Sequence, residues 1–268
     1  MYKEPVKGSY DRMFFLKHTL LLSESARRTV GLLLCCVLPC CLIPLPSAWG
    51  FSKTLQRSQE FLDAGYLVTK SDYVLRGFLE DPNMKWFQRN IGIARGVFIV
   101  PQMLRGAFLI GSSRGSGVLL ARDPATGRWS YPGFYAVNSV SMGLQIGADA
   151  SEIIFLVMTE QGVNAMLSSE FKIDSRIDSK IVVEAGLVGD GPPQEAVDIL
   201  AFARSMRGII RGVSLGGAVI TPCSSLNTAY YGRPVSLKDI LVRQRASNYK
   251  AESLRRRVAR ATKAPARH

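Results

Sequence analysis

The hydrophobic and polar positions of the chain follow a helical period up to about residue 95 and a strand-like pattern after it. Before residue 95, apolar residues recur every three or four positions, as in helices. Capping residues, glycine or proline mark the ends of these helical segments. We expect three helices here: 52–63, 71–79 and 83–95. The break between the first two is expected at Ala64 and Gly65.

After residue 95 the chain consists of short β-rich runs separated by glycine and turn residues. The predicted strands are 96–100, 106–111, 117–122, 128–131, 134–151, 151–159, 181–188, 199–203 and 208–220. Short helices are predicted at 160–169, 225–231 and 236–242. This order of elements predicts an α+β fold. We expect a single domain with a glycine-rich, mostly antiparallel β-sheet or barrel-like core, flanked by short helices on its N-terminal side.

The predicted helix 83–95 carries the clearest amphipathic pattern of the chain. Its apolar and basic positions alternate as on a surface helix, with Met84, Phe87 and Ile91 set against Lys85, Arg89 and Arg95. Arginines also precede glycine at the ends of predicted strands, as at Arg95 and Arg105. These arginines either keep strand ends in solvent or form an anion-binding rim.

Residues 1–50 have the parts of a secretory signal. Arg27 and Arg28 precede an apolar run at 29–43, and small residues follow at 47–50. The run contains proline and is shorter than the ~20 residues that a spanning helix needs. Four of the five cysteines lie beside or within it, and we interpret them as small hydrophobes, not metal ligands. The chain is therefore expected to be exported, to the periplasm or an envelope membrane.

The net charge of +13 is concentrated at the ends of the chain. Residues 243–268 carry +8 and residues 1–50 carry +3, whereas 51–242 carry only +2. We therefore divide the chain into a leader, 1–50, a globular domain, 51–242, and a basic tail, 243–268. The tail is either solvated or a basic helix on an anionic surface. The apolar side of that helix would be Ala246, Tyr249, Leu254 and Val258.

The composition excludes much catalytic chemistry. The two histidines, His18 and His268, lie near the chain ends, which argues against histidine triads and most zinc sites. A G-x-S-x-G pattern at 111–115 lacks a suitable downstream histidine. Asp149, Glu152 and Glu160 are interpreted as solvated carboxylates. We expect no enzyme activity, no cofactor and no metal, with a carboxylate–lysine enzyme as the remaining rival.

Four motifs occur in order: A-R-G-V-F-I-V-P at 94–101, G-S-G-V-L at 115–119, S-M-G-L-Q-I-G at 141–147 and Y-Y-G-R-P-V at 230–235. Over roughly 54–242 the chain resembles the SYLF domain, a lipid-binding module of exported bacterial proteins and of eukaryotic proteins with SH3 or FYVE domains. The resemblance implies a single α+β domain that binds lipid without catalysis. We interpret the matching motif positions as fold-determining: Gly96, Pro101, Gly106, Gly111, Gly115, Gly117, Gly143, Gln145 and Gly147.

The resemblance also implies a ligand. Eukaryotic members bind phosphoinositides with the help of an N-terminal amphipathic helix, and some bind actin; for an exported chain, anionic phospholipid is the natural substitute and nucleic acid is not expected. The predicted headgroup contacts are Lys85, Arg89, Arg95 and Arg105, with Trp86 and Phe87 inserting at the interface. The alternative is a protein-interaction or structural module of the envelope without a lipid ligand.

Overall fold

One long helix, α1 (Ala48–Glu80), opens the domain in this computed structural model, where the sequence predicted two. The structure describes residues 48–108, 110–141, 149–173, 181–185, 197–205 and 218–263. Buried positions of α1 recur every three or four residues across the predicted break: Ala64, Val68, Ser71, Leu75 and Phe78. Because this stripe is continuous, its packing carries the helix through Gly65.

Three short helical pieces follow α1: η2 (Pro82–Met84), α2 (Lys85–Asn90) and η3 (Ile91–Ile93). The carboxylate of Asp81 accepts a hydrogen bond from the backbone N–H of Asn83 at the start of this segment. Its apolar positions are buried, namely Met84, Phe87 and Ile91. The predicted amphipathic pattern is therefore confirmed, although the segment is not one regular helix.

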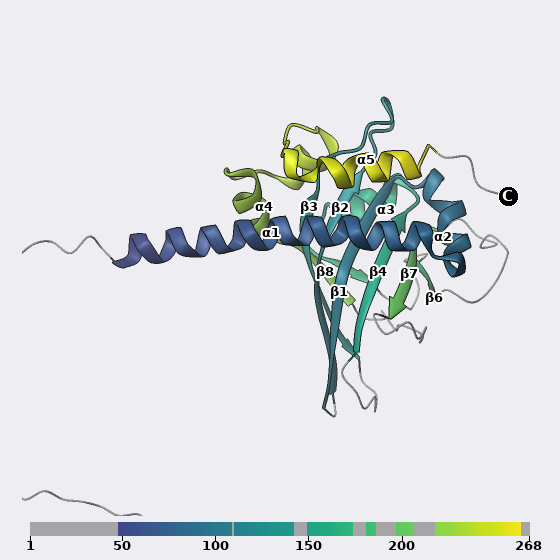
Figure 1. The fold of residues 1–268 in the computed structure, drawn as a ribbon, viewed down its shortest axis with the longest axis horizontal. Coiled ribbons are helices and arrows are strands. Elements are labelled where there is room, and N and C mark those ends of the chain that lie inside the picture. Colours follow the sequence, from purple (N-terminus) through teal and green to yellow (C-terminus); the bar gives the residue numbers. More distant parts are fainter. Residues whose placement is uncertain are drawn as a thin grey trace, which may run out of the picture. The chain divides into compact units, whose positions relative to one another are not determined.

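Within the described residues, eight strands form one curled sheet in the order β5-β8-β3-β2-β1-β4-β7-β6 (Figure 1). The strands are β1 (Gly96–Phe108), β2 (Ile110–Ala121), β3 (Gly133–Ser141), β4 (Asp149–Val157), β5 (Phe171–Ile173), β6 (Ile181–Ala185), β7 (Ile199–Ser205) and β8 (Ala218–Pro222). Among these described strands, β6 and β7 pair in parallel and all other neighbours pair antiparallel. The predicted single α+β domain with a mostly antiparallel sheet is confirmed.

β1 continues through Pro101, where the sequence predicted a strand end. Its register with β2 shifts between Ile99 and Gln102, so the proline lies in an irregularity that tolerates a missing N–H. Gly115 and Gly117 of β2 lie against it. A Cβ at these positions would meet the carbonyl oxygens of Gln102 at 2.8 Å and Ile99 at 2.6 Å. Two of the motif glycines are thus required by close approach of the backbone.

Other boundaries also differ from prediction. The short strand β5 was not predicted, and the expected strand 128–131 is reduced to one bridge between Arg122 and Trp129. The expected strand 106–111 spans the end of β1 and the start of β2. The predictions for 1–47, 142–148, 186–196 and 206–217 lie outside the described residues.

The side chains of the central strands alternate between two cores. In β1, Val97 and Ile99 belong to one core, and Phe98 and Val100 belong to the other. The first core contains the buried stripe of α1. The second is closed by residues of α3 (Glu160–Met166) and η4 (Lys238–Val242), whereas α4 (Ser224–Tyr231) buries Tyr230 in the first core.

The basic C-terminal segment is part of the fold. Residues 249–261 form η5 (Tyr249–Ala251) and α5 (Glu252–Ala261), and α5 lies beside α1 (Figure 1). Leu254 and Val258 are fully buried in the first core, and Ala246 is buried in the second. Tyr249, expected on the same apolar side, is 82% exposed. Residue 242 therefore does not divide the domain from a solvated tail.

A partly buried arginine joins the C-terminal end of α1 to the sheet. The Arg204 guanidinium of β7 contacts Glu152 of β4 at 2.5 Å and Asp81 at 3.7 Å. The guanidinium occupies the space that a side chain at position 77 would need, because a Cβ on Gly77 would lie 2.5 Å from Arg204 Nη2. Glu152, predicted to be solvated, is only 7% exposed. Gly77 therefore makes room for a salt bridge that neutralises a buried carboxylate.

A second ion pair joins α5 to α1. Arg257 Nε donates to Asp72 Oδ1 at 2.5 Å, and the hydroxyl of Ser253 donates to Asp72 Oδ2 at 2.9 Å. Burial alone would raise the pKa of Asp72, but these hydrogen bonds and the charges of Arg257 and Arg76 outweigh it and hold that pKa below its usual value. The carboxylate is thus stabilised in its ionised form.

The two glycines of α1 predict opposite effects of the same substitution. Gly65→Ala places its methyl in open space, so we expect stabilisation by about 0.5–1 kcal/mol from helix propensity. Gly77→Ala brings its methyl against the Arg204 guanidinium, which must shift, so we expect the weakened contact with Glu152 to outweigh the gain in helix propensity and to leave a net loss of about 1 kcal/mol. Urea unfolding of both variants measures this difference. Equal stabilisation by both would contradict the assigned role of Gly77.

The pair between Asp72 and Arg257 predicts a pH dependence. A carboxyl group whose pKa is lower in the folded state adds stability above its unfolded pKa of about 3.9, and this stability is lost as the pH falls through the folded pKa. At pH 7 we expect Asp72→Asn to cost about 1 kcal/mol, the upper range for a partly exposed pair. The cost should shrink below about pH 4. Asp63→Asn, which changes an exposed position of α1, is the control. A cost that stayed constant from pH 7 to pH 3 would exclude this linkage.

Candidate functional site

The outer side of α5 carries a row of cations. Leu254 and Val258 bury the inner side of the helix, and the Asn248 side chain, which accepts from the N–H of Lys250, caps the segment. The exposed positions therefore follow one another at helical spacing on the opposite side: Ser253, Arg256, Arg260 and Lys263. Packing of the helix thus presents three cations to solvent.

The charges of α5 divide into paired and unpaired groups. Arg257 is bound to Asp72, and Arg255 Nη2 contacts Glu252 Oε1 at 2.7 Å. No salt bridge among the described residues includes a member of the outer cation row, which we define as Arg256, Arg260 and Lys263. Arg256 Nε donates to the backbone carbonyl of Glu252 at 3.3 Å, and the charge of Arg256 helps to lower the pKa of the Glu252 carboxyl group, which is itself bound to Arg255. The outer cation row is therefore available to an external anion.

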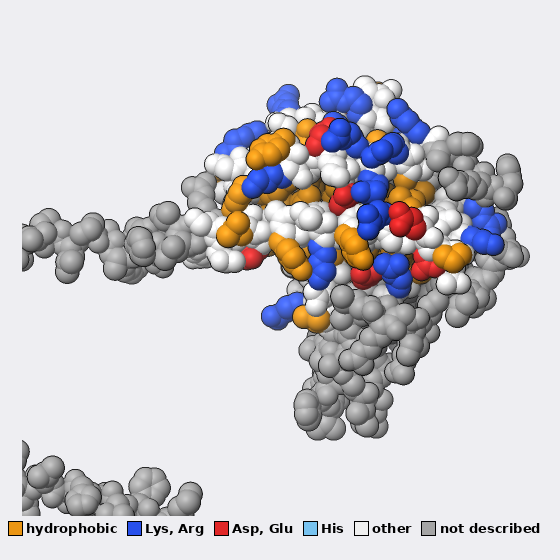
Figure 2. Space-filling view, viewed as in Figure 1, with side chains coloured by type: hydrophobic (Ala, Val, Ile, Leu, Met, Phe, Trp, Pro, Cys, Tyr) orange, Lys and Arg blue, Asp and Glu red, His pale blue; other side chains and the backbone are white. Residues whose placement is uncertain are grey.

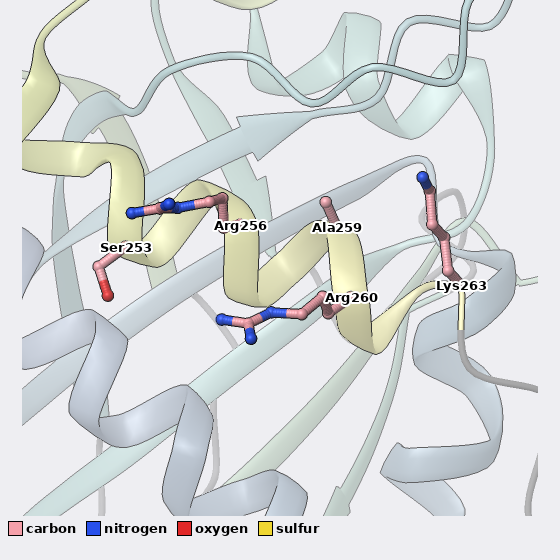
Figure 3. Close-up of a pocket in the computed structure, with 5 residues that line it drawn as sticks. All are labelled: Ser253, Arg256, Ala259, Arg260 and Lys263. Atoms are coloured by element: carbon pink, nitrogen blue, oxygen red, sulfur yellow. The ribbon is translucent and has the colours of Figure 1, made fainter.

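A hollow of about 330 Å³ lies along this row. It is lined by Ser253, Arg256, Ala259, Arg260 and Lys263 (Figure 3). Figure 3 shows Arg256 and Arg260 both extending back toward Ser253. Two guanidinium groups with this arrangement can donate several hydrogen bonds to phosphate oxygens.

The neighbouring face of α1 exposes apolar and aromatic side chains. Leu62, Tyr66 and Tyr73 are 61–65% exposed and lie at helical spacing. Lys70 lies over the Tyr66 ring at 5.6 Å, and Arg76 lies over the Tyr73 ring at 5.4 Å. Figure 2 shows hydrophobic side chains along α1 with cations between them and over α5. We call the outer cation row together with Leu62, Tyr66 and Tyr73 the α1–α5 face.

The residues predicted from sequence to bind headgroups do not form one site. Lys85 and Arg89 are exposed on α2. Arg95 lines a separate hollow at one end of the sheet. Arg105 lies on β1 opposite Ser113 and Asp149, and its side chain lies outside the described structure.

Of the two aromatic residues predicted to insert at an interface, Phe87 belongs to the protein interior and Trp86 is partly buried against it. Phe87 is fully buried, with its ring centroid 5.5 Å from that of Phe78 and 5.3 Å from that of Phe202. Trp86 is partly buried and packs against Phe202 at 5.2 Å. The predicted insertion of Phe87 at a membrane interface was wrong. Phe87 lies on the same side of the helical segment as Met84 and Ile91, and this side faces the core. A Trp86→Ala change would alter packing as well as any surface contact.

Sequence reasoning missed Tyr66 and Tyr73, and it placed the cation row on a tail. The tyrosines follow the exposed stripe of a helix that the prediction had broken at Gly65. The sequence did indicate that the cation row lies on a packed helix. Leu254 and Val258 are four residues apart, as on one side of a helix, and they follow a capping asparagine, Asn248.

None of the helices in the described ranges combines the length and the apolar character that a membrane span requires.

Comparison with known proteins relates this fold to one family. Residues 138–261 match the family described as "Ysc84: Las17-binding protein actin regulator". The matched range runs from within β3 to the end of α5. It includes Arg256 and Arg260 of the outer cation row but ends before Lys263, and it excludes Lys85, Trp86, Phe87, Arg89, Arg95 and Arg105.

The relatives include the SH3 domain-containing YSC84-like protein 1 of Xenopus laevis, 26% identical over 53% of this chain and 42% of the relative. The protein of the same name from Homo sapiens is 25% identical over 61% of this chain and 48% of its own length. SH3 domain-containing protein PJ696.02 of Schizosaccharomyces pombe is 25% identical over 61% of this chain and 38% of the relative. The matched part is therefore less than half of each relative. These names describe SH3 domain-containing proteins and no enzyme. The comparisons therefore show that this chain is similar to the Ysc84 family over residues 138–261, and similar at 24–26% identity to YSC84-like proteins over somewhat more than half of its length.

Proposed function

We propose that this chain is a non-enzymatic protein of the bacterial cell envelope that binds anionic phospholipid through its α1–α5 face. The observation that carries the proposal is the outer cation row. Its members, Arg256 and Arg260 of α5 and Lys263 just after the helix, are exposed and form no salt bridge in the described part of the chain. An anionic surface supplies the missing countercharge.

The energetics suit a peripheral contact. Each basic residue close to an anionic membrane contributes about 1 kcal/mol, and the attraction extends over a Debye length of about 8 Å at physiological salt. Tyr66 and Tyr73 add amphipathic rings, which are favoured at the boundary between headgroups and acyl chains. Charge is thus expected to recruit the protein, and the aromatic rings to retain it.

The sequence-predicted cations on α2, Lys85 and Arg89, form the competing surface. Both are exposed, but the apolar side of their helix faces the core and cannot enter a membrane while the domain is folded. The α1–α5 face has three exposed apolar or aromatic side chains, Leu62, Tyr66 and Tyr73, whereas the segment directly after α2 has one, Ile93, and this difference favours the α1–α5 face.

The envelope location rests on the interpretation of residues 1–50 as an export signal. The lipid ligand is supported by the resemblance to the SYLF domain and by the charge of the α1–α5 face. The matching family is described as a "Las17-binding protein actin regulator". A protein-interaction module without a lipid ligand is therefore the alternative function.

The first functional prediction compares two matched charge reversals. Arg256→Glu with Arg260→Glu alters α5, whereas Lys85→Glu with Arg89→Glu makes the same change of net charge on α2. We expect the α5 pair to lower binding to vesicles of phosphatidylcholine and phosphatidylglycerol by about tenfold or more, because two favourable contacts become repulsive. Co-sedimentation at low and physiological salt measures this, with circular dichroism to verify folding.

Vesicles of phosphatidylcholine alone should bind weakly, and raising the salt should mimic the α5 reversal. A larger loss from the α2 pair would move the site to α2. Equal binding to vesicles with and without phosphatidylglycerol would contradict the proposed anionic-lipid site. If the chain bound neither kind of vesicle but bound a protein partner, the interaction module would replace the lipid proposal.

The second functional prediction concerns the tyrosines. We expect Tyr66→Ser with Tyr73→Ser to retain the salt-sensitive part of vesicle binding and to lose the part that persists at high salt. Ile93→Ser, which removes another exposed apolar side chain (66% exposed) from η3, is the control. A salt titration of vesicle binding separates the two contributions. An unchanged salt-resistant fraction in the double variant would show that α1 does not contact the membrane.

A further inference from the structure

The segment directly before α5 exposes an aromatic side chain that the core does not use. Tyr249 of η5 is 82% exposed, more than Leu62, Tyr66 or Tyr73 of α1. Its hydroxyl forms no hydrogen bond with the described residues, and its ring makes no stacking or cation–π contact with them. One exposed tyrosine is ordinary on a protein surface, so its meaning depends on the residues around it.

Tyr249 is in phase with the outer cation row. The exposed positions that recur every three or four residues along this segment form one series: Tyr249, Ser253, Arg256, Arg260 and Lys263. Residues at this spacing share one side of a helix. The opposite side is fixed by Ala251, Leu254 and Val258, which are fully buried. The tyrosine therefore extends the outer side of α5 at its N-terminal end.

Hydrogen bonds on both sides of Tyr249 hold its backbone in place. Asn248 Nδ2 donates to the carbonyl of Tyr230 at 2.8 Å, and Asn248 Oδ1 accepts from the N–H of Lys250 at 3.0 Å. The N–H of the buried Ala251 donates to the carbonyl of Asn248 at 3.0 Å. A turn fixed in this way presents the tyrosine rigidly, so binding through it costs mainly the freedom of its own side chain.

Two contacts fix the relative direction of α1 and α5. Lys250 Nζ lies 4.2 Å from the centroid of the Phe61 ring, which partly offsets the charge of the ammonium group. Further along both helices, Arg257 is bound to Asp72. Because the residue numbers on both helices increase from the first contact to the second, α1 and α5 run in the same direction, as Figure 1 also shows.

The two ends of the α1–α5 face therefore differ in character. Leu62 and Tyr66 follow Phe61 in α1, so they lie toward the end that carries Tyr249. The opposite end carries Arg260 and Lys263, which form no salt bridge among the described residues. One end thus suits an apolar environment, and the other suits an anionic one.

We propose that Tyr249 inserts into the bilayer and that its end of the α1–α5 face lies deepest in the membrane. This inference rests on the proposed phospholipid binding and adds the orientation of the bound domain. The Tyr249 ring lies at the boundary between headgroups and acyl chains, where amphipathic rings are favoured. Leu62 and Tyr66 enter beside it, whereas Arg260 and Lys263 remain among the phosphate groups.

Quenching of tryptophan fluorescence by brominated acyl chains measures this orientation. Tyr249→Trp, Tyr73→Trp and Ile93→Trp each place a tryptophan at an exposed position of the full chain, and the emission of the unsubstituted chain is subtracted. The vesicles contain brominated phosphatidylcholine and phosphatidylglycerol. We expect the added emission to be quenched about twofold more in Tyr249→Trp than in Tyr73→Trp, because the Tyr249 end lies deeper. Ile93→Trp, which lies outside the face, should not be quenched.

Replacement of the tyrosine gives a second readout. Tyr249→Ser should weaken vesicle binding about fivefold at both low and high salt, because salt does not screen the contribution of an interfacial ring. The effect of Arg256→Glu with Arg260→Glu should instead shrink as the salt rises. Tyr249→Trp should bind as tightly as the unsubstituted chain, since tryptophan also favours the interface. Circular dichroism verifies that each variant is folded.

Three results would overturn this inference and leave the lipid site on α5 intact. The first is quenching of Tyr249→Trp no stronger than that of Ile93→Trp on vesicles that bind the chain. The second is stronger quenching of Tyr73→Trp than of Tyr249→Trp, which would reverse the orientation. The third is full vesicle binding by Tyr249→Ser. If the unsubstituted chain bound no vesicles, the proposed function would fail, and the inference with it.

Discussion

A sheet that is apolar on both faces has to be covered on both sides, and this requirement places the helices of the domain. In β1 and β4, neighbouring residues such as Val97 and Phe98 are buried in different cores. The first core takes the stripe of α1 and the inner side of α5. The second is closed by residues of α3 and η4. The outer sides of α1 and α5 then become a surface of the molecule by necessity, and their composition is free to serve binding.

Burial also sorts the charges of α5. Arginines at the edge of the buried side are matched by carboxylates, as Arg257 is by Asp72 and Arg255 is by Glu252. The positions that point away from the core need no such match for folding, because solvent screens them. A helix with this many cations would repel itself if it were isolated, but tertiary contacts through Leu254 and Val258 hold it in place. The net basicity of the segment is thus compatible with an ordered structure.

The sequence predicted the class of fold because its strongest signals are local. Glycine and turn residues mark strand ends, and the positions of Met84, Phe87 and Ile91 reveal a helical face. It did not predict the continuity of α1, because the packing that carries the helix through Gly65 comes from strands far away in the sequence. The same limit applies to Glu152. Its partner, Arg204, lies on a neighbouring strand, so a carboxylate that looks solvated in the sequence is a buried member of an ion pair.

The candidate site was missed for a related reason. Periodicity identifies an amphipathic helix but does not say whether its apolar side meets a membrane or the protein's own core. In the segment around Phe87, the apolar side packs against the protein's own core. Insertion of that aromatic side chain into a bilayer would remove it from contacts with Phe78 and Phe202, which would cost several kcal/mol, as loss of a buried phenylalanine does.

A membrane contact by the folded domain must therefore use side chains that the core does not need. Tyr66, Tyr73 and the outer cation row meet this condition, because they are exposed while the inner sides of α1 and α5 are fixed by packing. A surface already held rigid loses little conformational entropy on association, apart from that of its own arginine and lysine side chains. Adsorption of a preformed face is for this reason the mode of binding that the fold favours, and no opening of the domain is required.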